Sequence, residues 1–370
     1  MKRKGFTLVE LLAVIAILAI LVIIALPNVL KMFNDSKKNS FLTEAKTVYS
    51  EVSKKYISET MKGNKLTYIS SEDDTKLEMT GRDLQYCVLL NTDGSVKSMK
   101  VSNGEWIAEL PSGKKITDLN SSDLEDGNLN DYDCYNPFRD DSWETIASNV
   151  KAGSTSNYHV GDEKEVDLGT TYGKHKVRIA NLKSPTEEGC GTNGFSESAC
   201  GFVVEFTDII TRHIMNPTST NKGGWLNSQM KTFINNDIYN SLPQELKSVI
   251  ITTETVSGYG SEDTNNFTSP EDKLYLLAPA EIYSGWSNRY DKYDMASDKT
   301  RQLDYYKIKG VTTNSRDGAI KKNSEGTDDW WWLRSACSGN NVDFYTVYGG
   351  NWGGYAAIYT SGVSPAFRIG

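Results

Sequence analysis

The residue with the clearest chemical possibilities lies near the amino terminus, where Glu10 stands in an apolar stretch that runs from Phe6 to Leu26. A carboxylate at the centre of a membrane helix costs about 2.5–3.5 kcal/mol on insertion scales, so such acids usually have a partner. If the chain is cut between Gly5 and Phe6, a new cationic amine lies one helical turn from Glu10, in the same subunit or in a neighbouring one. The alternative is an ordinary anchor whose Glu10 carboxylate reaches back to the lipid headgroups.

This stretch predicts a membrane anchor. At ~1.5 Å per residue, the segment 6–26 forms about 31 Å of helix, close to the hydrocarbon thickness of a bilayer. A secretory signal peptide has a shorter apolar core, roughly 7–15 residues, followed by a small-residue cleavage site. Three cations, at positions 2–4, precede the stretch. They orient the amino end toward the cytoplasm before processing and place everything after about Met32 outside the cell membrane.

Residues 4–10, Lys-Gly-Phe-Thr-Leu-Val-Glu, with the apolar run and Pro27 behind them, resemble the amino-terminal signal of type IV prepilins and pseudopilins. The resemblance implies cleavage between Gly5 and Phe6 by a prepilin peptidase and methylation of the new amine, giving N-methylphenylalanine. It also implies packing with other pilin subunits in which Glu10 neutralises a neighbour's amine. Pro27 falls where helices of this family commonly kink.

Five cysteines are available for cross-links, and disulfides persist on the outer side of a membrane. Cys190 and Cys200 close a short glycine-rich loop and are the favoured pair. Cys87 and Cys134 are a second, weaker candidate pair that would staple the chain back onto a small sheet. Cys337 is then the odd cysteine, and we expect a small buried apolar side chain there rather than a nucleophile.

Other chemistry has little support in the sequence. No Cys-x-x-Cys or Cys/His spacing of a zinc site occurs, and the three histidines are scattered, so we predict no metal and no cofactor. No acid pair or triad lies in a known motif, which predicts that the protein is not an enzyme, although dispersed carboxylates such as Glu205 and Glu281 leave catalysis open. The net charge of −8 and the lack of a Lys/Arg-rich face argue against nucleic acid as a partner.

Aromatic residues near the carboxyl terminus are candidates for recognition. Tyr348, Asn351 and Trp352 lie on a glycine-rich stretch and are typical of a stacking platform for sugar or peptide, with surface exposure and burial equally open. For Trp331 and Trp332 we expect core positions instead.

The elements that position these residues begin with a helix over 6–62, of which about 6–30 is transmembrane. Its later part carries apolar residues at helical spacing on one face, namely Phe41, Ala45, Val48, Tyr49, Val52 and Tyr56. Short β-prone runs separated by turns predict a small antiparallel β subdomain over 63–118. The acidic, turn-rich stretch 119–142 predicts a solvated linker, because its Asp/Asn spacing does not fit a helix-loop-helix calcium site.

The remaining residues, 143–370, predict a larger head domain of mixed type. Strand-like runs such as 273–278 alternate with short helical patterns around 229–238, so the fold class of the whole chain is α+β. The motifs Trp-Trp-Leu-Arg-Ser at 331–335 and Gly-Val-x-Pro-Ala-Phe at 362–367 resemble an uncharacterised domain of Gram-positive surface proteins. They are similar, more loosely, to C-type-lectin-like and formylglycine-generating-enzyme-like folds. The calcium-binding sugar triplet and the paired copper-binding cysteines of those families are not in the sequence.

Two functions of different classes follow. The favoured one is a minor or tip-type pilin-like subunit, present in the cell membrane and in an extracellular pilus or pseudopilus, whose head binds a surface glycan or protein. The alternative is a surface-anchored enzyme that acts on wall or host polymers. A pseudopilin of a secretion or competence system is a further variant of the first function.

Overall fold

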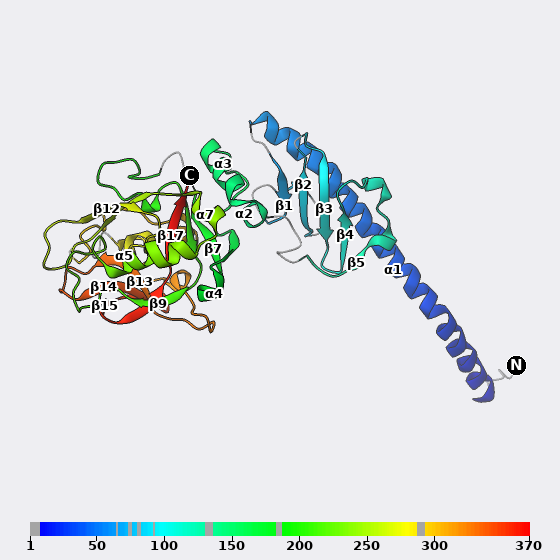
Figure 1. The fold of residues 1–370 in the computed structure, drawn as a ribbon. Coiled ribbons are helices and arrows are strands. Elements are labelled where there is room, and N and C mark those ends of the chain that lie inside the picture. The colour runs from blue at the N-terminus through cyan, green and yellow to red at the C-terminus, as the bar shows by residue number, and fades with distance from the viewer. Residues whose placement is uncertain are drawn as a thin grey trace. The chain divides into compact units, whose positions relative to one another are not determined.

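The computed structural model of the chain describes residues 8–63, 66–72, 76–79, 83–91, 93–129, 136–182, 187–286 and 293–370. The chain folds into two compact units, Met1–Tyr135 and Asn136–Gly370 (Figure 1). A long apolar helix followed by antiparallel sheets and short helices confirms the predicted α+β class.

The first unit consists of one long helix and one sheet. The helix is α1 (Leu8–Met61). The sheet is an antiparallel meander in chain order, made of β1 (Tyr68–Ser70), β2 (Gln85–Leu90), β3 (Val96–Ser102), β4 (Trp106–Leu110) and β5 (Glu125–Asp126). Two short 3₁₀ turns, η1 (Ile116–Asp118) and η2 (Ser121–Asp123), lead from β4 to β5.

The later half of α1 packs its apolar face on this sheet. Phe41, Val48 and Val52 of the helix are buried against alternate residues of the strands, which include Val88, Met99, Val101, Trp106 and Ala108. Successive side chains of a strand point to opposite faces, so one face of each strand meets the helix. The predicted amphipathic face of the helix is confirmed.

Part of the stretch for which we predicted a solvated linker belongs to the first unit instead. Leu119 and Leu124 are 4% and 7% exposed and belong to its core. The two residues of β5, Glu125 and Asp126, pair with β4. Burial of these two leucines stabilises the packing of the segment on the edge of the sheet, although the residues around them are acidic.

The second unit begins at Asn136 and contains many short elements. Its helices are α2 (Pro137–Asp140), α3 (Trp143–Ala152), α4 (Gly169–Tyr172), η3 (Glu197–Ala199), α5 (Gln229–Phe233), η4 (Ile234–Ile238), α6 (Tyr239–Ser241), α7 (Gln244–Lys247), α8 (Pro279–Ile282), α10 (Asp304–Ile308) and η5 (Asp317–Ala319). Its strands are β6 (Glu163–Asp167), β7 (Lys174–Asn181), β8 (Phe202–Phe206), β9 (Thr211–Ile214), β10 (Ile250–Ile251), β11 (Thr253–Ser257), β12 (Phe267–Asp272), β13 (Trp331–Ala336), β14 (Asp343–Tyr348), β15 (Asn351–Ala356), β16 (Thr360–Val363) and β17 (Ala366–Ile369).

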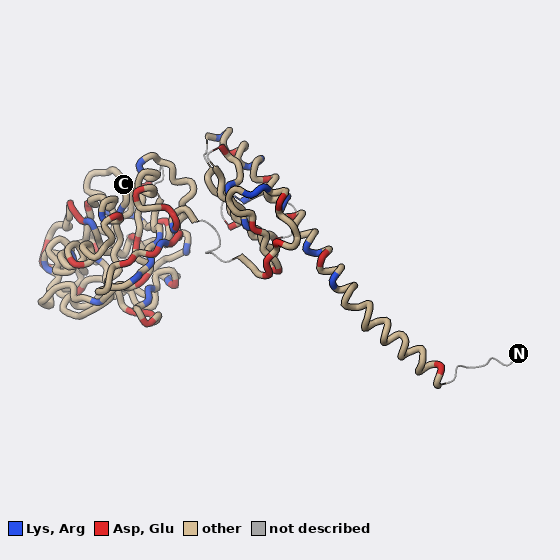
Figure 2. The backbone as a smooth tube through the Cα atoms, turned by 45° about the vertical axis from the view of Figure 1, so that its right-hand side comes forward, with Lys and Arg blue, Asp and Glu red and all other residues tan. Residues whose placement is uncertain are grey.

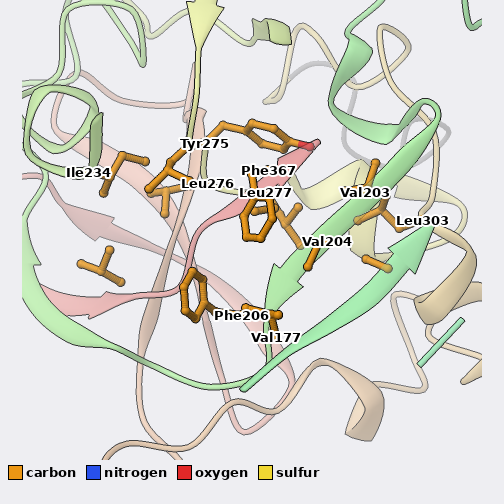
Figure 3. Close-up of a cluster of buried hydrophobic side chains, with 14 of the residues drawn as sticks. Val177, Val203, Val204, Phe206, Ile234, Tyr275, Leu276, Leu277, Leu303 and Phe367 are labelled. Carbon is orange, nitrogen blue, oxygen red and sulfur yellow. The ribbon is translucent and has the colours of Figure 1, made fainter. Parts of the chain in front are cut away.

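These strands form two five-stranded sheets and a hairpin. One sheet has the order β10-β17-β8-β7-β6, the other has the order β15-β14-β13-β16-β9, and β11 pairs with β12. Among the described strands, all pairings are antiparallel except that of β13 with β16. Side chains from the first sheet, such as Val204 and Phe367, pack with Ile234 of η4 and Leu277 in one hydrophobic core (Figure 3).

The segment 273–278, which we predicted as a strand, forms only one isolated bridge, between Tyr275 and Ala366. The backbone N–H of Arg334 also donates to the carbonyl of Leu277 at 3.0 Å, and side chains supply further partners. The amide of Asn235 donates to the carbonyl of Leu274 at 2.9 Å and its oxygen accepts from the N–H of Lys273 at 2.9 Å. Because these polar groups take the place of a neighbouring strand, segment 273–278 is buried and extended without being part of a regular sheet.

Candidate functional site

The first half of α1 is apolar on every side. Residues 11–30 contain no charged side chain. In Figure 2 this part of the helix is tan throughout and follows a single acidic position, drawn in red, near the start of the helix. Leu18 and Ile23 are 55% and 71% exposed. The most apolar window of α1 has a mean hydropathy of 3.2, and by length and composition α1 is the one helix in the described ranges that can cross a membrane.

Glu10 lies in the first turn of α1 as the structure describes it, and Pro27 lies within the helix, which continues to Met61. Proline has no N–H to donate to the carbonyl four residues earlier. In the next residue, the side-chain amide of Asn28 donates to the carbonyl oxygen of Ile24 at 3.3 Å. Residues 1–5, with Gly5, and Phe6 lie outside the described residues, so cleavage and N-methylation there stay predictions.

The second unit is built around a buried ion pair between Arg334 of β13 and Glu281 of α8. Both side chains are 0% exposed, and the two guanidinium nitrogens lie 2.6 and 2.5 Å from the two carboxylate oxygens. Further polar groups complete the cluster: Ser196, Ser198, Ser257, Thr300 and the carbonyl of Leu276. Burial alone would lower the pKa of Arg334, but the Glu281 carboxylate raises it. Arg334 therefore stays charged, and the cluster joins segments that are distant in the chain.

A second buried cluster surrounds Glu205 of β8. Its carboxylate accepts hydrogen bonds from Arg178 at 3.0 Å, from Lys321 at 2.8 Å and from the hydroxyl of Tyr306 at 2.8 Å. Burial raises the pKa of Glu205, but the two cations outweigh this and lower it. Burial lowers the pKa of Lys321 to about 8. Because Glu205 is 0% exposed, like Glu281, both carboxylates suit a structural role.

Trp330, which directly precedes β13, is at the centre of a group of rings that we call the aromatic ladder: Tyr348, Trp330, Tyr355 and Tyr359. The ring of Trp330 stacks on Tyr348, with centroids 4.9 Å apart and planes 11° apart. It also stacks on Tyr355 at 5.7 Å and 17°. The ring centroids of Tyr355 and Tyr359 lie 5.1 Å apart. The ladder therefore joins residues at the start of β13, the end of β14, within β15 and after β15.

The turn between β14 and β15 sets the register of the ladder. Gly349 and Gly350 have φ values of 52° and 75°, the left-handed conformation at both turn positions that two-residue hairpins favour and glycine supplies most readily. A side chain at Gly350 would also begin 2.2 Å from the carbonyl oxygen of Arg316. The strands consequently pair without a slip along their length, from Tyr348 opposite Asn351 onward.

The three predicted ligand-binding residues do not share one face. Tyr348 and Asn351 are directly paired across the hairpin and lie on the same face of the sheet. Trp352 is the next residue along β15, so it lies on the other face. There its ring is 5.1 Å from that of the buried Trp286. A single platform of these three residues is therefore not formed, whereas Tyr348 is 45% exposed and belongs to the ladder.

The cysteines divide as follows. Cys190 and Cys200 form the predicted disulfide, which closes the loop that carries Ser196 and Ser198 into the Arg334 cluster. Cys337 is a free cysteine of intermediate burial, partly exposed where we expected full burial. Cys87 of β2 is disulfide-bonded; Cys134 lies outside the described residues, and the predicted pairing of these two stays a prediction.

Comparisons with known proteins match the two ends of the chain. Residues 1–26 match a family described as the prokaryotic N-terminal methylation motif, so the chain carries a type IV pilin- or pseudopilin-type signal. Residues 204–370 match a family described as a domain of unknown function (DUF6273). No curated protein and no solved structure matches the chain.

The matched domain is smaller than the folded unit that contains it. The match begins inside β8, yet β8 pairs with β7, which pairs with β6. Ser198 of the disulfide loop also precedes the match and donates to Glu281 in the buried cluster. Among the described residues, no group of three or more His, Cys, Asp and Glu side chains is placed to hold a metal ion.

Sequence reasoning missed most of the aromatic ladder. Trp331 and Trp332 are buried as expected, and Trp330, which precedes them, is partly exposed. Strand alternation does not distinguish it, because alternation would place Trp330 on the same face as the buried Trp332. Tyr359 lies in a turn and carries no periodic signal, so its approach to Tyr355 required the fold.

Proposed function

We propose that the protein is a type IV pilin-like subunit of minor or tip type, in which α1 anchors and assembles the chain and the second unit is a binding head without catalytic activity. The observation that carries the proposal is α1 itself. Its first half exposes apolar side chains all round, with Glu10 near its start, and its second half is integrated into a folded unit. Such a helix is stable only with lipid or with other helices around its first half.

The methylation motif supports the same proposal. In the pilin-type arrangement, prepilin peptidase cuts before Phe6, the new amine is methylated, and Glu10 meets the amine of a neighbouring subunit. A carboxylate in apolar surroundings gains most from such a partner, because leaving it unpaired is costly. A second unit of residues 136–370 is bulky for a repeating subunit, which favours a low copy number near a fibre tip. Immunogold labelling of sheared fibres tests this point, since dense and even labelling would contradict it.

The first test is the effect of Glu10 on assembly. We expect Glu10→Gln to reduce incorporation into surface fibres at least tenfold, because the neighbour's amine loses its counter-charge. Asp35→Asn is the matched control, since it neutralises an exposed carboxylate of the same helix outside the apolar segment, and it should assemble normally. Immunoblots of sheared fibres against total cell protein measure the ratio.

Undiminished incorporation of Glu10→Gln would refute the assembly role. Mass spectrometry of the mature protein supplies an independent check: a chain that begins with methylated Phe6 supports the proposal, and an intact Met1 terminus rejects it.

A further inference from the structure

The aromatic ladder is the main concentration of exposed apolar surface on the second unit. Among the described residues of that unit, five large hydrophobic side chains are exposed, and three of them, Tyr348, Ile358 and Tyr359, belong to or adjoin the ladder. Tyr348 is 45% and Tyr359 is 55% exposed. Exposed aromatic side chains in contact with one another are costly to leave in water and commonly mark a recognition surface.

The composition of this surface selects among partners. Of the exposed side chains at the ladder, only Ile358 is aliphatic, whereas Tyr348 and Tyr359 carry a hydroxyl at the ring tip. Insertion into lipid hydrocarbon would favour aliphatic side chains. Rings with polar tips suit a ligand that offers C–H groups and hydroxyls together, because the ring contacts the former and the phenol hydrogen-bonds the latter.

Both arginines beside the ladder already donate hydrogen bonds to oxygens of the protein. Arg212 forms an ion pair with Asp329, which precedes Trp330, and donates to the carbonyl oxygen of Thr360 at 3.1 Å. Arg316 donates to the side-chain oxygen of Asn351 and to the carbonyl oxygen of Thr313 at 2.7 Å. Arg212 and Asp329 form a neutral pair, and both guanidinium groups already donate to protein oxygens, so the surface favours an uncharged ligand over an acidic one.

The ladder is also preorganised. The rings of Tyr348 and Tyr355 are held nearly parallel on Trp330, and β14 and β15 are paired along their whole length. Little side-chain freedom remains to be lost when a ligand binds, which lowers the entropic cost of binding.

We propose that the aromatic ladder is the ligand-binding surface of the head and that it takes a neutral polysaccharide, whose sugar rings contact Tyr348 and Tyr359. This inference rests on the proposed function, because it names the ligand class of the binding head. The polar rim supplied by Asn351 and the tyrosine hydroxyls orients the sugar hydroxyl groups. Arg212 and Arg316 hold the rim in place through their hydrogen bonds to Thr360 and Asn351.

The test uses the full-length protein in lipid nanodiscs. Its binding to soluble neutral polysaccharides (hydroxyethyl cellulose, glycol chitin, dextran and mannan) is measured by affinity electrophoresis and tryptophan fluorescence. Polygalacturonate and liposomes of anionic lipid serve as the charged and the lipid probe. We expect saturable binding to at least one neutral polysaccharide and none to the other two probes.

Two substitutions separate ring stacking from general apolar contact. Tyr359→Leu should weaken binding roughly tenfold, or about 1.4 kcal/mol, because it keeps apolar area and removes the ring. Tyr359→Phe should retain most of the affinity. Ile308→Ala is the matched control, an exposed apolar side chain on α10, and should bind like the wild type. Both tyrosine variants are at an exposed position, and equal thermal unfolding midpoints verify that they fold.

Three results would overturn the inference: no binding to any neutral polysaccharide, equal binding by Tyr359→Leu and wild type, or ladder-dependent binding to liposomes or polygalacturonate. None of these would affect fibre incorporation. Conversely, variants that fail to bind sugar but assemble normally support the inference, and a wild-type chain that binds sugar without assembling would reject only the pilin role.

Discussion

The two units of the molecule bury different kinds of side chain. Within the described part of the first unit, the buried residues are apolar apart from two serines, and none of them is charged. The second unit buries seven charged side chains: Arg178, Glu205, Asp272, Glu281, Asp294, Lys321 and Arg334.

The difference has a structural cause. In the first unit a regular sheet and a helix satisfy their own backbone groups, so only apolar faces need to meet. In the second unit, the extended segment 273–278 makes only isolated backbone contacts with strands, through Tyr275 with Ala366 and Leu277 with Arg334. Arg334 donates to the carbonyl of Leu276 at 2.9 Å, and the Glu281 carboxylate accepts from the N–H of Ala278 at 2.8 Å. Buried charged groups thus supply hydrogen bonds that neighbouring strands supply in a regular sheet. We therefore predict that the stability of the second unit, and not that of the first, depends on single ionised side chains.

The largest effect is expected from Arg334→Met. It leaves the Glu281 carboxylate buried without its counter-charge, which typically costs 3–5 kcal/mol, so the second unit should unfold at a much lower denaturant concentration. Seven of the eight tryptophans belong to that unit and one, Trp106, to the first, so tryptophan fluorescence reports mainly on the second. The double variant Arg334→Met/Glu281→Leu should recover part of the loss. A single variant as stable as the wild type would refute the role of the pair.

Removal of the disulfide is expected to have an intermediate effect. Cys190→Ser/Cys200→Ser opens a short loop and should destabilise the second unit by about 2–3 kcal/mol. The loop also carries Ser196 and Ser198 to the buried ion pair, so the loss should be smaller in an Arg334→Met background. Cys337→Ser, which changes a free thiol, is the control and should be nearly neutral. Equal losses in both backgrounds, measured by urea unfolding, would show that the loop and the ion pair are independent.

A third effect, the one that depends on pH, involves Asp294. Its side chain is 1% exposed and accepts from Trp286 Nε1 at 2.9 Å. Burial raises its pKa to about 6 from the usual 3.8. The folded state therefore binds this proton more tightly than the unfolded state, and the free energy of unfolding decreases as the pH rises from about 4 to about 6.

Asp294→Asn removes this contribution while its carbonyl oxygen still accepts from Trp286. We expect the variant to gain stability relative to the wild type as the pH rises from 4 to 7, by up to about 3 kcal/mol if the whole shift is expressed. Urea titrations of the variant and the wild type at several pH values measure the difference between their free energies of unfolding. Contributions from the other carboxylates are the same in both proteins and cancel in this difference. A pH-independent difference would exclude Asp294 as the titrating group.

Much of the first unit could be predicted from the sequence. The apolar run after Glu10 and the helical spacing of Phe41, Val48 and Val52 are local patterns, and the structure has the helix and its buried face as expected. The Cys190–Cys200 pair was also predictable, because its partners are ten residues apart and loop closure favours short separations.

The candidate site was less predictable, since its members are distant in the chain. Glu281 and Arg334 meet across 53 residues, and Trp330 meets Tyr348 and Tyr355 only because β13, β14 and β15 are neighbours in one sheet. A sequence pattern shows that a residue is apolar or charged; strand order and register decide which such residues meet. The expectation of one platform with Tyr348, Asn351 and Trp352 failed for this reason.

By itself the sequence determined the anchor, the amphipathic helix, the short disulfide loop and the mixed class of the fold, because each depends on interactions between residues close in the chain. Only the tertiary structure decided which charges are buried in pairs, which aromatic residues are core and which form the exposed ladder. Those outcomes depend on strand pairing between distant segments, and the free energy of burying a charge or a ring is set by the neighbours that this pairing supplies.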